Sequence, residues 1–270
     1  MKKHPFRIAI ENGANKDELS KLFSPNVVLM APMLSKPIIG VSKVLSVITN
    51  AAQLGGPIKY TLEVSDSRQT FLFWDGKAGG YTLQASTILV DGEDGLIREV
   101  RVVMRPWPVS TIFRNAMHEK LSSEIPEEYW VLGPKLDNGG KPLSFTPIAL
   151  QSVEMSSDVV MHSPILAKAV SGKERVEASL KFAHQVQSRS SYTSIIATPE
   201  VLVELFDCDA DGYPMEGIWL QRLNPKGLIR ELTVMLRPYP AVTVLRDKTK
   251  ELAEKSGLLD AGYWQLAKPQ

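Results

Sequence analysis

The feature that most constrains this chain is an internal repeat with a period of 132 residues. The segment from Gly95 to Pro108, GLIREVRVVMRPWP, returns between Gly227 and Pro240 as GLIRELTVMLRPYP. The same shift, applied without a gap to residues 22–118, gives 27 identities in 97 positions. Because solenoid repeats are about 20–50 residues long, a period of this length indicates two whole domains.

The segment between the two copies predicts the domain boundaries. Residues 133–142, GPKLDNGGKP, are rich in glycine and proline and contain little that a core could bury, which is typical of a linker. We therefore expect a first domain over residues 1–132, a linker over 133–142 and a second domain over 143–270. A chain of 270 residues is long enough for two domains of about 130 residues each.

Hydrophobic patterning predicts the same order of elements in each copy, and it is clearest in the second. A short strand over 159–162 precedes a helix, for which Ser171 and Glu174 fit a capping box. The next segments alternate or are rich in β-branched residues, and a helix with Gly257 as its C-terminal cap closes the copy. The predicted strands and final helix are 191–197, 201–207, 217–223, 228–237 and 243–255. This order is α+β rather than alternating βαβ.

Particular motifs carry a resemblance to a known family. The sequences DVVMHSP from Asp158, EGIWL from Glu216 and GLIRELTVMLRP from Gly227 resemble the SnoaL-like branch of the nuclear-transport-factor-2-like superfamily, and residues 26–108 look similar. The resemblance implies two tandem cone-shaped domains, each a curved antiparallel sheet wrapped on helices. It also implies a pocket for a hydrophobic small molecule, and pairing of the two domains through their sheets as an intramolecular pseudo-dimer.

The resemblance leaves the activity open, because one fold hosts many functions. One hypothesis is an isomerase, dehydratase or cyclase that works by acid–base proton transfer in the second domain. The alternative is a non-catalytic small-molecule binding or carrier protein. A third and weaker hypothesis is a protein-interaction module.

Composition narrows the partners and cofactors. Lys and Arg number 31 against 30 Asp and Glu, so the near-neutral chain lacks the positive surplus that nucleic acid or an anionic membrane requires. Cys208 is the single cysteine, which excludes an internal disulfide and a thiolate zinc site within one chain. We expect no metal and no cofactor. The sequence shows no signal peptide and no membrane-spanning apolar run, so we expect a cytoplasmic protein.

Differences between the copies single out catalytic candidates in the second domain. His162, Asp158 and Glu216 stand where the first copy has a methionine, an asparagine and a glutamine. General acid–base catalysis requires a group that can carry a proton, so these three are the predicted catalytic residues. Each also has a structural interpretation, namely a hydrogen bond at a strand end, a turn or a solvent-facing carboxylate. His184 and Glu204 are expected on the surface.

A further set of residues is predicted to bind the ligand, because their side chains can line a pocket or donate hydrogen bonds: Tyr192, Trp219, Arg237, Tyr213, Tyr60, Arg105 and Met30. In the last strand, alternation puts Glu231, Thr233, Met235 and Arg237 on one face and Leu232, Val234 and Leu236 on the other. Arg237 therefore either binds a ligand in the pocket or pairs with acids across the contact between the domains. Arg105 and Arg237 also stand where polyketide cyclases carry an acid, which departs from the family pattern.

Overall fold

The structure is a computed structural model that describes residues 3–136, 153–187 and 190–268. Most of the expected linker and the start of the expected second domain, residues 137–152, lie outside the described residues. Below, the first half means residues 3–136 and the second half means residues 153–268.

The first half contains four α-helices and six strands within the described residues. Two short helices precede the first strand, and α3 and α4 flank the long strands. In chain order the elements are α1 (Pro5–Glu11), α2 (Lys16–Ser20), β1 (Phe23–Met30), β2 (Ile38–Ile39), α3 (Val41–Gly55), β3 (Lys59–Ser65), β4 (Gln69–Ala78), β5 (Tyr81–Asp91), β6 (Ile97–Arg105), α4 (Trp107–Leu121) and the 3-10 turn η1 (Glu127–Tyr129).

The second half repeats this order from the first strand onward. Its elements are β7 (Met155–His162), β8 (Val170–Ser171), α5 (Lys173–Val186), β9 (Ser190–Ala197), β10 (Val201–Ala210), β11 (Tyr213–Leu223), β12 (Ile229–Arg237), α6 (Tyr239–Ser256) and η2 (Ala261–Tyr263). Strands β7, β8, β10, β11 and β12 have the bounds of their first-half counterparts shifted by 132 residues. The sequence repeat is thus also a repeat of secondary structure.

Four long strands of each half form an antiparallel meander, and a further strand of eight residues pairs parallel with the last of them. Along the sheet the order is β3-β4-β5-β6-β12-β11-β10-β9, with β1 parallel to β6 and β7 parallel to β12. The two meanders meet where β6 and β12 pair antiparallel, with Met104 opposite Leu236. The predicted α+β class, an antiparallel sheet wrapped on helices, is confirmed.

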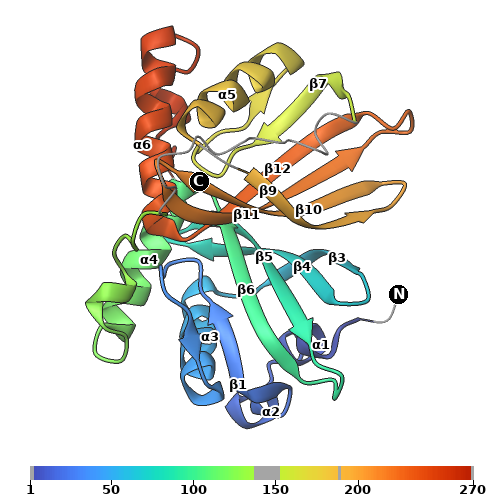
Figure 1. The fold of residues 1–270 in the computed structure, drawn as a ribbon, viewed down its shortest axis with the longest axis vertical. Helices are drawn as coiled ribbons and strands as arrows, with labels where there is room; N and C mark the ends of the chain where they lie inside the picture. The colour runs from blue at the N-terminus through green and yellow to red at the C-terminus, as the bar shows by residue number, and fades with distance from the viewer. Residues whose placement is uncertain (1–2, 137–152, 188–189, 269–270) are drawn as a thin grey trace.

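The two halves also pack sheet against sheet, and the helices lie on the outer sides (Figure 1). A buried apolar cluster between the sheets contains residues of both halves, among them Phe71, Phe73 and Val103 with Ile218 and Met235. Each half has in addition its own core between sheet and helices. The central strands β4, β5, β6, β10, β11 and β12 therefore present one face to the helices of their own half and the other to the opposite half.

Prolines and glycines set the ends of several elements. Pro106 and Pro238 follow β6 and β12 directly and precede α4 and α6, since proline cannot continue the strand ladder. Gly257 ends α6 in the left-handed conformation at φ 70°, as expected for a glycine cap. The expected capping box at α5 is wrong: Gly172 is the N-cap, and Ser171 pairs with Val160 as part of β8.

No helix in the described ranges is both long enough and apolar enough to cross a lipid bilayer.

Candidate functional site

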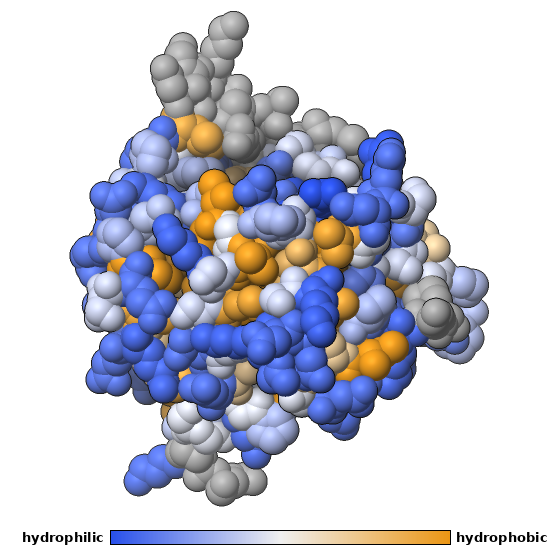
Figure 2. Space-filling model, turned by 90° about the horizontal axis from the view of Figure 1, so that it is seen from below, coloured by the Kyte–Doolittle hydropathy of each residue, from blue (hydrophilic) through white to orange (hydrophobic). Residues whose placement is uncertain are grey.

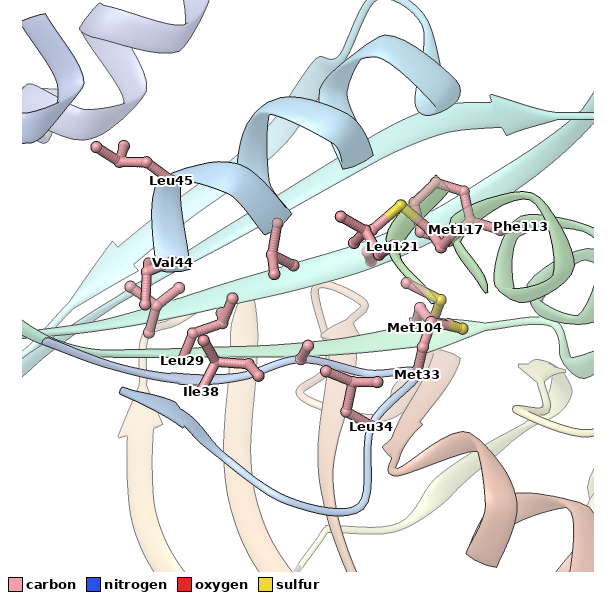
Figure 3. Close-up of a cluster of buried hydrophobic side chains, with 14 of the residues drawn as sticks. Leu29, Met33, Leu34, Ile38, Val44, Leu45, Met104, Phe113, Met117 and Leu121 are labelled. Atoms are coloured by element: carbon pink, nitrogen blue, oxygen red, sulfur yellow. The ribbon is translucent and has the colours of Figure 1, made fainter. Parts of the chain in front are cut away.

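The first half encloses an apolar cavity of about 100 Å³ between its sheet and helices α1, α3 and α4. Residues of α3, β6, α4 and the segment that follows β1 form much of its wall, and in Figure 3 Leu29, Met33, Met104, Met117 and Leu121 gather between strand and helices. The lining residues come from distant parts of the chain, and none of them carries a charge. We call this space the first-half cavity.

Few polar groups face the first-half cavity. Thr87 accepts a hydrogen bond of 3.0 Å from the indole Nε1 of Trp74, so this donor and this acceptor already satisfy each other. Tyr60 also lines the cavity, as the sequence led us to expect of a ligand-binding residue, and burial raises the pKa of its phenol well above the ordinary range. A phenol that stays protonated can donate a hydrogen bond but cannot act as a base near neutral pH.

Several lining residues of the first-half cavity that are not buried, among them Ile10, Ala52 and Ile58, lie on α1 and around the end of α3, so the cavity is open on this side. Glu63 of β3 holds helix α1 over this end. Its carboxylate accepts a hydrogen bond of 2.7 Å from the backbone N–H of His4 and one of 3.0 Å from Arg7 Nη1. Figure 2 looks at the molecule from below, and apolar patches in the middle of that face are bordered by hydrophilic residues.

The second half has a smaller cavity of about 50 Å³ in the equivalent place, called here the second-half cavity. Trp219 and Phe206 form its wall with ring centroids 5.7 Å apart, so Trp219 lies where a ligand-binding residue was expected. His184 also lines it, where the first-half cavity has Ala52, and burial lowers the pKa of this imidazole. His184 was expected on the surface, and the structure leaves it half-buried at the wall of this cavity.

Glu204 was also expected on the surface, and the structure buries it completely. It lies on the same face of β10 as Phe206, and its Oε2 accepts a hydrogen bond of 2.6 Å from Gln221 Nε2. The second oxygen, Oε1, is buried without a hydrogen-bond partner within the described residues, and desolvation raises the pKa of the carboxyl to about 7. At the equivalent positions the first half has two leucines, Leu72 and Leu89.

The sequence did contain a signal for this pair. The 132-residue register aligns both polar residues with leucines, Leu72 and Leu89, and the structure buries all four completely. Their contact could not be predicted, because it depends on the register of β10 against β11.

A third space, called here the junction cleft, has a volume of about 390 Å³ and is lined by residues of both halves. Four residues singled out in the sequence line it: Met30 from β1, and Tyr213, Glu216 and Arg237 from the second half. Arg237 therefore lies on the side of β12 that faces the other half, and Val234 and Leu236 line the second-half cavity instead. Of the two alternatives for the last strand, the structure shows the contact between the halves.

Glu216 is the centre of the charged groups at the junction cleft. Arg101 of β6 donates a hydrogen bond of 2.6 Å from Nη1 to Glu216 Oε2, and it also donates to Glu99. Arg237 Nη1 lies 3.8 Å from Glu216 Oε1, which is an ion pair and too long for a hydrogen bond. Burial raises the pKa of Glu216, and it lowers the pKa of Arg237.

Arg105 is the first-half counterpart of Arg237, and its surroundings differ. Its Nε donates a hydrogen bond of 3.0 Å to the carbonyl oxygen of Ser163, and its Nη1 donates to Gln84 Oε1. Burial lowers the pKa of this guanidinium to about 10. Arg105 is thus tied to the backbone of the second half, and it does not line the junction cleft.

The three predicted catalytic residues do not come together. His162 Nε2 lies 3.4 Å from Glu231 Oε1 of β12, and this contact holds the pKa of Glu231 below its ordinary value. Asp158 is exposed on β7, and Glu216 lies at the junction cleft. None of the three lines the second-half cavity. Their catalytic role is untested and stays a prediction.

Tyr192, the remaining predicted ligand-binding residue, packs beside Phe206 with ring centroids 6.3 Å apart, and burial raises the pKa of its phenol to about 12. Across the ranges that the structure describes, no three His, Cys, Asp or Glu side chains are grouped so that they could hold a metal ion.

Comparison with known proteins gives a likeness of structure only. No family model and no curated protein matches the chain. Similar solved structures include an uncharacterized protein with a cystatin-like fold from Silicibacter pomeroyi, with 22% identity and a TM-score of 0.42 over 45% of this chain and 88% of that one. A steroid delta-isomerase from Pseudomonas aeruginosa has 22% identity and a TM-score of 0.41, over 44% and 87%.

An NTF2-like protein of unknown function from Cytophaga hutchinsonii has 20% identity and a TM-score of 0.32, over 39% of this chain and 88% of that one. Each of these proteins thus matches less than half of the chain along most of its own length.

Proposed function

We propose that this chain binds a compact hydrophobic small molecule in the first-half cavity and does no chemistry on it there. The observation that carries this proposal is the lining of the cavity, which is apolar almost throughout and includes no charged residue. General acid–base catalysis requires a side chain that can accept or donate a proton near neutral pH, and no charged residue lines this cavity. The cavity does offer a favourable transfer of apolar surface out of water.

The size of the cavity limits the ligand. An apolar cavity of about 150 Å³ in another protein stays dry and binds benzene. The first-half cavity, at about 100 Å³, is smaller, so a single ring would fill it and a larger molecule would require α1 to move. Burial of apolar area is worth roughly 25 cal/mol per Å², so a single ring that leaves water completely gains a few kcal/mol.

The repeat supplies a matched pair of variants for the test. Ala51 lines the first-half cavity, and Ala183, 132 residues later, lines the second-half cavity. A phenylalanine at either position fills its own cavity and leaves the other unchanged. Binding of fluorobenzene would be followed by ¹⁹F NMR line broadening in the wild-type protein, Ala51→Phe and Ala183→Phe.

We expect Ala51→Phe to abolish fluorobenzene binding and Ala183→Phe to leave it within about twofold of wild type. Ala52→Phe, on the open side of the cavity, is a second blocking variant in case Ala51→Phe does not fold. Equal binding by wild type, Ala51→Phe and Ala52→Phe would refute the proposal.

A second candidate function is proton transfer in the second half, and Glu204 is the observation in its favour. A buried carboxyl with a pKa of about 7 can both give and accept a proton near neutral pH. It lies beside the wall of the second-half cavity formed by Phe206 and Trp219. The sequence prediction of acid–base chemistry in the second domain therefore has a different candidate residue from the three first named.

Hydrogen–deuterium exchange at carbon tests this function without knowledge of the substrate. The protein would be incubated with cyclohexanone in D₂O, and deuterium at the α-carbon measured by mass spectrometry. Proton transfer by Glu204 predicts exchange above background that is lost in Glu204→Gln and kept in Glu200→Gln, whose carboxylate is exposed. No exchange above background, or equal exchange by all three proteins, would argue against it.

The two halves are proposed to work as an intramolecular pair, equivalent to a dimer of single domains. The apolar cluster between the sheets and the pairing of β6 with β12 support this interpretation. On this view, the second half is required for the stability of the cavity in the first.

A further inference from the structure

Arg105 at the end of β6 and Arg237 at the end of β12 are equivalent by sequence, but their guanidinium N–H groups differ in their hydrogen-bond partners. Arg105 donates to the Ser163 carbonyl and to Gln84. Arg237 is just as buried, yet its Nε has no partner within the described residues, and its one charged contact, with Glu216, is 3.8 Å long. A guanidinium has five N–H donors, and leaving such groups unpaired inside a protein is costly.

The position of Arg237 indicates where a ligand could pair with its guanidinium group. Its side chain lines the junction cleft, whereas Arg105 does not. The cleft is a sizeable space of about 390 Å³, within the range of small-molecule sites, and its wall is otherwise largely apolar, with Met30, Met215 and Tyr213 prominent. Arg237 thus brings to the wall of this space a guanidinium whose nearest acid, Glu216, is 3.8 Å away, and the space is large enough to hold a carboxylate ligand.

We propose that the junction cleft is a second ligand site, in which Arg237 binds the carboxylate of a small acid whose apolar body packs on Met30, Met215 and Tyr213. Arg–carboxylate pairs are frequently bidentate, and they are among the stronger hydrogen-bonded contacts in proteins. The site is separate from the first-half cavity and does not depend on the function proposed for it.

The acids around Arg237 are Glu216, Glu99 and Asp207, and the first two are held by another arginine. Arg101 donates a hydrogen bond of 2.6 Å to Glu216 and also donates to Glu99. Glu216 therefore compensates the charge of Arg237 only across the 3.8 Å contact. Asp207 also lines the cleft and opposes an anion, which favours ligands with a single negative charge.

Two neighbouring exposed residues give a matched test at the rim. Leu132 and Val131 are 39% and 46% exposed, and only Leu132 lines the junction cleft. Leu132→Asp puts a negative charge into the cleft, and Val131→Asp puts the same charge one residue outside it. Arg237→Lys keeps the positive charge and removes the planar fork.

The experiment is a titration with benzoate, followed by isothermal titration calorimetry on the full chain. We expect one saturable site with a Kd of about 1 mM or tighter, as small ligands of this size can reach. Arg237→Lys and Leu132→Asp should weaken binding by about tenfold, and Val131→Asp by less than about twofold. Benzamide, which has the same shape without the charge, should bind more weakly than benzoate.

The proposal is overturned if benzoate does not bind saturably, or if Leu132→Asp binds it as tightly as Val131→Asp. Because Leu132 is exposed, its variant keeps the test valid even if Arg237→Lys fails to fold. Loss of benzoate binding in Ala51→Phe would also overturn it, because it would move the ligand to the first-half cavity.

Discussion

Arg101 of β6 donates a hydrogen bond of 2.6 Å to Glu216 of β11, across 115 positions of sequence and from one half of the molecule to the other. The Glu216 side chain is 8% exposed and that of Arg101 is 23% exposed, so water screens this pair less than a surface ion pair. The contact has no counterpart in the symmetric position, because Thr233 and Gln84 replace the two charged residues there.

Removing one partner of this pair should destabilise the protein more than removing both. Arg101→Met leaves Glu216 buried with only the 3.8 Å contact to Arg237, and we expect a loss of about 2–4 kcal/mol. Arg101→Met combined with Glu216→Gln should recover a good part of that loss. Urea unfolding of the wild type, both single variants and the double variant measures the coupling.

Lys255→Met is the control for the Arg101 series, because the pair of Lys255 with Glu251 is 70% and 67% exposed. Its stability should lie within about 0.5 kcal/mol of wild type. Strict additivity of the two single variants would mean that Arg101 and Glu216 do not interact in solution.

Glu204 should make the stability of the protein fall as the pH rises. Its pKa is about 7 in the folded chain and near its ordinary value of 4.5 when unfolded, so the folded state holds the proton longer. The folded state is therefore favoured at acidic pH, and that advantage is lost between about pH 4.5 and pH 7. Across this window the group should contribute a decrease of up to about 3 kcal/mol.

Glu204→Gln, compared with wild type by urea unfolding at pH 5 and pH 8, isolates this contribution. The variant cannot ionise at this position, so the difference between the two pH values should shrink. Glu204→Leu, which installs the first-half residue, should also be more stable than wild type at pH 8. An unchanged pH dependence in Glu204→Gln would show that the carboxyl is not buried as described.

The sequence predicted the repeat, the α+β order and the alternation along β12, because all three follow from local patterns. It did not predict which face of β12 meets the helices. Both faces of that strand are buried, one by its own half and one by the other, so Val234 and Arg237 look equally plausible as pocket residues. That choice depends on how two sheets pack, which no window of sequence contains.

Two sequence predictions were wrong for the same kind of physical reason: the surface position expected for Glu204 and the helix cap expected at Ser171. A glutamate is rarely buried without a partner, and the partner Gln221 lies on the neighbouring strand. Ser171 has the right chemistry for a helix cap, but it belongs to the two-residue strand β8 and pairs with Val160 of β7. In both cases a tertiary contact overrode a sound local rule.

Gly217 of β11 should not tolerate a side chain. A Cβ built there would lie 2.4 Å from Leu236 Cδ2 and 2.6 Å from Phe206 Cζ, at the wall of the second-half cavity. We expect Gly217→Ala to cost about 1–3 kcal/mol through overpacking. The first half has Ala85 at this position, so the reverse change Ala85→Gly should cost about 1 kcal/mol or less.

Thermal unfolding of both variants would rank these costs. Gly217→Ala as stable as wild type would mean that the Phe206 ring is not held against the strand.

The central claim is that an apolar molecule binds in the first half, and a crystal of the protein soaked with bromobenzene tests it most directly. Anomalous scattering locates the bromine without reference to any assumed pose. We predict a peak inside the first-half cavity, among Leu29, Met104 and Phe113. A peak confined to the second-half cavity or the junction cleft, or no peak in a well-diffracting soaked crystal, would contradict the account.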